Sequence, residues 1–164
     1  MRSPSPRPQP AQLFRNASDD ACIVLEECGQ ALLFAEVLAA HPDLSAAGYR
    51  TGETPEAFTA LRQALVDRGA HQFDAAAAVL LGAPRRHRMA EGRTSNGLRY
   101  IAEHLTGRPV SDGATIAALI ACGVPVKRTP GSPHVEIGLS ASWLHRQAAM
   151  PRGGRPATVI SRRE

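Results

Sequence analysis

Residues 98–139 constrain the fold of this chain more than any other stretch. Two short helical patterns come first, and an alternating run then folds back at a proline-glycine turn. The apolar residues of the first pattern recur at the helical spacing i, i+3, i+4 and i+7: Leu98, Ile101, Ala102 and Leu105. Ser95-Asn96 can cap this helix, and Gly107 ends it. The sequence therefore predicts a helix from about residue 95 to 106.

The second pattern is a helix over 113–122 followed by a hairpin. Ser111-Asp112 is a capping sequence for the helix, and Gly123 ends it. The apolar residues on either side of the turn at 129–133 alternate with polar ones: Val124, Val126, Val135, Ile137 and Leu139. A β-hairpin with one apolar face is therefore predicted. Ser140 then caps a short last helix, in which Trp143 and Leu144 pack back on the domain.

The composition permits a core but makes it one of small side chains. Hydrophobic residues are 43% of the 164 residues, whereas aromatic residues are only 4%. Helices with such a core pack closely, with little contact area per residue. No run of about 18 apolar residues is present, and the proline-rich N-terminus lacks the apolar region of a secretory signal. We expect a cytoplasmic protein without a membrane contact.

No residue pattern indicates catalysis, a metal or a cofactor. The cysteines Cys22, Cys28 and Cys122 form no close pair, so we interpret them as small buried hydrophobic residues. The six histidines show no ligand spacing with carboxylates or cysteines. Phosphate-binding glycine loops and the Gly-x-Ser-x-Gly motif are absent from the sequence. We expect a protein that is not an enzyme.

The two halves of the chain differ in charge. Residues 1–83 contain six arginines and ten acidic residues, a net charge of −4, whereas residues 84–164 contain thirteen cationic and five acidic residues, a net charge of +8. A basic C-terminal half favours a polyanionic partner. The alternative is that the positive charge reflects only a solvated surface with basic chain ends.

The acidic half predicts a helical unit over 18–83, after a proline-rich arm over 1–17. Helices are expected at 21–40, from Thr54 to about residue 68, where Gly69 ends the helix, and at 73–81. The loop at 42–53 has no strand pattern. A homodimer contact through this helical unit is a candidate.

Residues 84–94 read as a basic linker because Arg85, Arg86 and Arg88 follow one another closely. Such an arm can reach a phosphate backbone and make contacts that do not depend on sequence. The alternative is an exposed linker between domains. A second unit over 95–150 and a disordered basic tail over 151–164 complete the expected organisation.

The second unit resembles the winged helix-turn-helix DNA-binding superfamily of bacterial regulators. The segments that carry this resemblance are IAEHL, a turn, a helix ending in LIACGV, and a hairpin, together spanning 98–139. The resemblance implies a mainly α chain whose C-terminal unit is a small winged-helix-like α+β domain with one β-hairpin. It also implies that 113–122 is in the place of the recognition helix and that 127–134 is the wing.

The helix at 113–122 departs from the residues that usually read base edges. Recognition helices present Arg, Lys, Asn, Gln or Ser to the major groove, but this helix offers only Thr115, with Ser111 and Asp112 at its start. Asp112 also has the wrong charge for phosphates. A helix this apolar can equally be buried in a core or a dimer interface.

These observations lead to two function hypotheses. The first is a DNA-binding regulatory or accessory protein that contacts duplex DNA mainly through phosphates. Its candidate contact residues are Arg85, Arg86, Arg88, Ser111, Thr115, Lys127 and Arg128, with the tail arginines as auxiliaries. The alternative is a non-enzymatic protein-interaction or structural accessory protein of a phage, plasmid or bacterium. The two differ in whether the cations gather on the face of the 113–122 helix.

Overall fold

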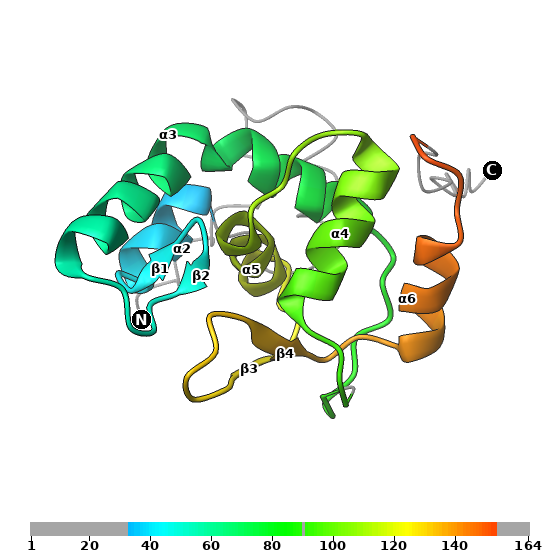
Figure 1. Ribbon diagram of the computed structural model, residues 1–164. Coiled ribbons are helices and arrows are strands. Elements are labelled where there is room, and N and C mark those ends of the chain that lie inside the picture. Colours follow the sequence, from blue (N-terminus) through cyan, green and yellow to red (C-terminus); the bar gives the residue numbers. More distant parts are fainter. Residues whose placement is uncertain (1–32, 90, 154–164) are drawn as a thin grey trace, which may run out of the picture.

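The computed structural model describes residues 33–89 and 91–153, and this part of the chain is mainly helical with a small β portion (Figure 1). Its elements in chain order are α2 (Phe34–Ala40), β1 (Leu44–Ser45), β2 (Gly48–Tyr49), α3 (Pro55–Val79), α4 (Ser95–Thr106), α5 (Asp112–Ala121), β3 (Val126–Arg128), β4 (Val135–Ile137) and α6 (Ala141–Ala148). The strands form two separate antiparallel hairpins, β1–β2 and β3–β4. The expected fold class is confirmed.

Helix α5 lies at the centre of the molecule. It runs between α3 and α4, and α2 and β2 also pack against it (Figure 1). The small side chains of α5 allow these elements to approach closely, as the composition predicts. Nine of its ten residues are buried.

One hydrophobic core joins the described parts of the two expected units. Leu65 and Phe73 of α3 belong to the same cluster of buried residues as Ile116 and Leu119 of α5. The expected units at 18–83 and 95–150 therefore share one hydrophobic core and do not each have their own. The reason is that α5 is apolar on every side, so that one layer of helices cannot cover it.

Helix α3 continues through Gly69, where the sequence predicts an end. A glycine that ends a helix takes a left-handed conformation, and Gly69 is not among the positive-φ glycines of the described residues. A Cβ atom built on Gly69 would lie 2.5 Å from Cζ of Phe34. The Phe34 ring also packs on Phe73, with ring centroids 5.3 Å apart. Gly69 thus makes room for an aromatic ring inside one long helix, and the prediction of two helices was wrong.

Helix α2 ends at His41, as predicted, and α3 stabilises that end. The Arg62 guanidinium donates hydrogen bonds to the carbonyl oxygens of Leu38, His41 and Leu44, at 2.6, 3.1 and 2.6 Å. Carbonyl groups in the last turn of a helix have no partner within the helix, and the guanidinium supplies one. The earlier part of the helix predicted over 21–40 lies outside the described residues, as do the arm at 1–17, Cys22 and Cys28.

The predicted caps of α3, α5 and α6, the hairpin and the last helix are confirmed, whereas α4 begins after Thr94 without a side-chain cap, so the predicted Ser95-Asn96 cap was wrong. Thr54, Ser111 and Ser140 each accept a hydrogen bond from a backbone N–H of the first turn of α3, α5 and α6, respectively. The β3–β4 pairing sets Val126 opposite Ile137 and Arg128 opposite Val135. In α6, Trp143 and Leu144 are buried against the domain. The loop at 42–53 differs from the prediction because it contains the β1–β2 hairpin.

Candidate nucleic-acid interface

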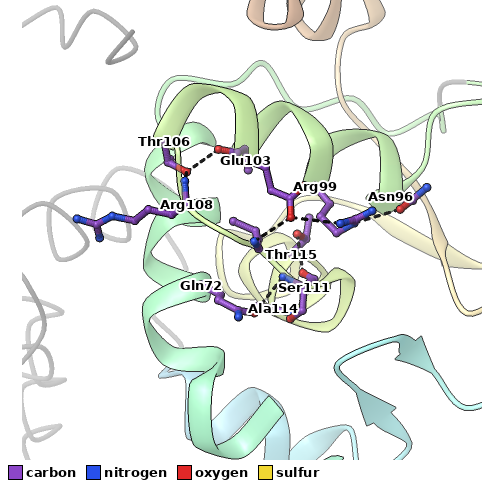
Figure 2. A network of polar contacts seen from close by, with 11 residues as sticks. Gln72, Asn96, Arg99, Glu103, Thr106, Arg108, Ser111, Ala114 and Thr115 are labelled. Carbon is purple, nitrogen blue, oxygen red and sulfur yellow. Dashed lines mark hydrogen bonds and ion pairs between the residues drawn. The ribbon is translucent and has the colours of Figure 1, made fainter. Parts of the chain in front are cut away.

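The helix expected to read DNA is inaccessible. Thr115 is completely buried in α5, and its hydroxyl donates to the Ser111 carbonyl oxygen at 3.0 Å. The Ser111 hydroxyl caps the helix by accepting from the Ala114 N–H, and the Ser111 N–H donates to Oε1 of Gln72 on α3 (Figure 2). The polar groups of both residues are therefore engaged inside the fold. The expected role of Thr115 as a DNA contact is therefore wrong, whereas Ser111 is partly exposed and uses its side chain to cap α5.

The start of α5 is covered by the loop that contains β1 and β2. The Gly113 N–H donates to the Ala46 carbonyl oxygen at 3.3 Å, and Gly113 also lies directly against the Ser45 carbonyl group. A Cβ atom at Gly113 would overlap with that carbonyl oxygen. The N-terminal end of α5 has no room for a DNA groove in this arrangement.

Asp112 lies at this covered end and faces the β3–β4 hairpin. It is only 5% exposed, and its Oδ2 atom lies 3.0 Å from Nδ1 of His134. Burial raises the pKa of Asp112, while the hydrogen bond from His134 opposes that rise. Gly48 packs against Oδ2 and against the Pro133 carbonyl group, which leaves no space for a larger residue. The carboxyl group is therefore enclosed by α5, the hairpin and the β1–β2 loop, and it connects the three.

A second contact also holds the hairpin in place. The Arg128 Nη1 atom lies 2.7 Å from Oδ2 of Asp43, and its guanidinium stacks over the Tyr49 ring at 3.9 Å from the centroid. The Tyr49 N–H donates to the Pro133 carbonyl oxygen, and its hydroxyl lies 2.9 Å from Nδ1 of His41. Arg128 is thus balanced by a carboxylate and positions the hairpin.

Lys127 extends further into solvent. Its side chain is 69% exposed, and Nζ lies 3.7 Å from a carboxylate oxygen of Glu136 on the neighbouring strand. An exposed pair at this distance is weak, since water and salt screen it. Lys127 can therefore exchange this contact for one to a phosphate.

The linker expected at 84–94 is built into the sheet. The Arg86 N–H donates to the Gly138 carbonyl oxygen at 2.7 Å, and the Ile137 N–H donates to the Arg93 carbonyl oxygen at 3.2 Å. Isolated antiparallel bridges also join Arg85 to Leu139 and Thr94 to Glu136. Strand β4 consequently has β3 along one side and two pieces of the 84–94 segment along the other.

We call the arginine side chains of this segment the basic edge. All four are exposed: Arg85, Arg86, Arg88 and Arg93. In the described part of the chain, Arg86, Arg88 and Arg93 form no ion pair. The backbone hydrogen bonds to β4 hold the two ends of the segment, so the basic edge is anchored and not a loose arm.

The structure thus brings together most of the cations expected from the sequence, but not around α5. The backbone of Arg85 and Arg86 pairs with residues 138 and 139 at the end of β4, and Arg88 follows two residues later. Lys127 and Arg128 lie on β3, at the other edge of β4. The sequence reasoning missed Arg93. The signal was available, because Arg93 immediately precedes the cap of α4 and falls within the expected linker. Arg152 of the expected basic tail is exposed after α6, and the tail from residue 154 lies outside the described residues.

No protein-family model, curated protein or solved structure matches this chain. Within the described ranges, no helix has both the length and the apolar character needed to cross a membrane. The same residues contain no group of three or more His, Cys, Asp or Glu side chains that could hold a metal ion. Cys122 is fully buried in the core. The surface cations are therefore the features from which a function can be argued.

Proposed function

We propose that this protein is a DNA-binding regulatory or accessory protein that contacts duplex DNA through phosphates. The observation that carries the proposal is the anchored basic edge beside β4, with Lys127 across the sheet. Arginine side chains bind phosphate oxygens with paired N–H donors, and contacts to the DNA backbone do not require a recognition helix. Since α5 is covered, the proposal includes no base readout by that helix.

Membership of the winged-helix superfamily is part of this proposal. The order of helix, turn, helix and hairpin is present in α4, α5, β3 and β4. In this proposal the β3–β4 hairpin is the wing, and Lys127 lies on it. A cytoplasmic location and a homodimer contact through the helical unit at 18–83 also belong to the proposal.

The alternative is a non-enzymatic protein-interaction or structural accessory protein, and the covered α5 helix favours it. The scarcity of exposed apolar side chains argues against this alternative. Among the described residues, the exposed large hydrophobic side chains are Val66 and Tyr100, and they lie on different helices. Protein docking surfaces generally bury clustered apolar and aromatic side chains, whereas a DNA interface is polar and cationic. The surface composition therefore favours DNA over a protein as the partner.

The test is binding of the full chain to a labelled random-sequence duplex at about 50 and 200 mM salt. Affinity should fall by roughly two or more orders of magnitude over this range if several phosphates are neutralised. The triple variant R86Q/R88Q/R93Q should bind at least about tenfold more weakly at the lower salt concentration.

A matched control separates the basic edge from net charge. The variant R68Q/R108Q/R146Q removes three exposed arginines from α3, the loop after α4 and α6, so it has the same net charge as the first variant. It should retain most of the affinity. Absence of binding at the lower salt concentration, or equal losses in the two variants, would refute the proposed function.

A further inference from the structure

Tyr100 on α4 is an aromatic side chain that the fold leaves in solvent. It is 58% exposed, which is the largest exposure among the large hydrophobic residues described. One side of its ring is covered, because the Arg99 guanidinium carbon lies 4.1 Å from the ring centroid. The hydroxyl-bearing ring is thus presented to solvent with a cation stacked on it.

The stacked guanidinium is held in place from two directions. The Arg99 Nε atom donates to Oδ1 of Asn96, and its Nη1 atom donates to Oε1 of Glu103, both at 3.2 Å (Figure 2). The same Glu103 oxygen accepts the Val110 N–H at 3.1 Å. Since Arg99 is only 21% exposed, this support is partly shielded from water. The Tyr100 ring therefore rests on a fixed planar group.

The basic edge ends next to the start of α4. The Arg93 carbonyl oxygen bonds to β4, and α4 starts two residues later at Ser95. Tyr100 is five residues further, a rise of about 7.5 Å along the helix axis. Gly97 lies between them on the exposed side, and a Cβ atom built there meets nothing within 4 Å. The surface around Gly97 is therefore open, and the axial rise from the start of α4 to Tyr100 is about two nucleotide steps of one DNA strand.

We propose that Tyr100 stacks on an unpaired nucleobase while the basic edge holds the adjacent phosphates. Aromatic side chains next to a cationic surface bind single-stranded nucleic acid in this way, because every base has a π face. In an intact duplex each base is already stacked on its neighbours, and extruding one costs free energy. The preferred ligand is therefore DNA with a single-stranded stretch next to the duplex. This inference rests on the proposed function.

The experiment compares a blunt duplex of about 20 base pairs with the same duplex carrying a single-stranded overhang of about six nucleotides. The overhang should tighten binding of the wild-type chain by about five- to 150-fold, since one base stacked on an aromatic ring contributes that much. Tyr100→Ala should abolish this preference and leave binding to the blunt duplex unchanged. Tyr100→Phe keeps the ring and should retain the preference.

Val66→Ala is the matched control, because it shortens the other exposed hydrophobic side chain on a different helix. It should change neither affinity. Equal binding of the two DNAs by the wild-type chain, or an overhang preference that survives in Tyr100→Ala, would overturn the inference. Failure of the proposed function gives a different result, since the chain would then bind neither DNA, or R86Q/R88Q/R93Q would bind both as the wild type does.

Discussion

Alanine at Gly113 tests whether the start of α5 is covered. A Cβ atom there overlaps with the Ser45 carbonyl oxygen and would lie 3.2 Å from Cδ2 of Leu65. The overlapping atom belongs to the backbone, so the β1–β2 loop must move. The Gly113 N–H would also lose its hydrogen bond to Ala46. Overpacking costs about 1–3 kcal/mol and the lost hydrogen bond about 1 kcal/mol, whereas alanine in place of glycine returns roughly 1 kcal/mol within a helix.

The net loss expected for Gly113→Ala is therefore about 2 kcal/mol in the free energy of unfolding. In a domain of this size, the melting temperature should fall by roughly 5–10 °C. Gly97→Ala is the matched control in the first turn of α4, where the new methyl group meets nothing within 4 Å. It should be neutral or stabilise the protein by up to about 1 kcal/mol. If urea denaturation gives the two variants equal stability, the start of α5 is not covered, and this reasoning is wrong.

Three further substitutions test other contacts. Arg62→Met removes two hydrogen bonds to the end of α2 and one to β1, and it should destabilise the protein by about 2 kcal/mol in urea denaturation. Arg68→Met, on the exposed side of α3, should change stability by less than about 0.5 kcal/mol. Ser111→Ala removes the cap of α5 and should cost about 1 kcal/mol by the same assay, and no change would contradict that role. Burial raises the pKa of Asp112 in the folded state, so the wild type loses stability as pH rises from the unfolded-state pKa near 3.9 through the folded-state pKa. Asn at this position does not titrate. The stability of Asp112→Asn relative to the wild type should therefore increase over that pH range. A stability difference between the two proteins that stays constant from about pH 3 to pH 8 would contradict the raised pKa.

The local signals in the sequence predicted local structure well. Ser111 and Ser140 are good caps because a side-chain hydroxyl next to an apolar periodic run satisfies a free N–H. The β3–β4 hairpin followed from alternation around a Pro-Gly turn. These features depend on residues that lie close together in the chain.

The contacts that cover α5 could not be read from the sequence in the same way. Gly69 carries the signal of a helix end, and only the position of the Phe34 ring, 35 residues earlier, explains why the helix continues. Asp112 and His134 are 22 residues apart, and no spacing rule connects them. The all-round apolar character of 113–122 favoured burial, and a resemblance over 98–139 alone left that alternative open.

The cations of the candidate interface could be predicted from the sequence, but their contacts could not. Charge composition identifies Arg85, Arg86 and Arg88 because a cluster of arginines stands out in any window. Composition does not show that their backbone pairs with β4, or that Arg128 is balanced by Asp43. Side chains of the same charge therefore have different roles, and only the tertiary contacts distinguish them.

The most direct test of the phosphate-binding account is the salt dependence of binding to random duplex DNA. Each phosphate neutralised contributes about −0.9 to the slope of log K against log salt concentration. R86Q/R88Q/R93Q should therefore make the slope shallower by about 2 to 3, whereas R68Q/R108Q/R146Q should leave it unchanged. The same slope for the wild type and the basic-edge variant would contradict the claim that these arginines contact the DNA backbone.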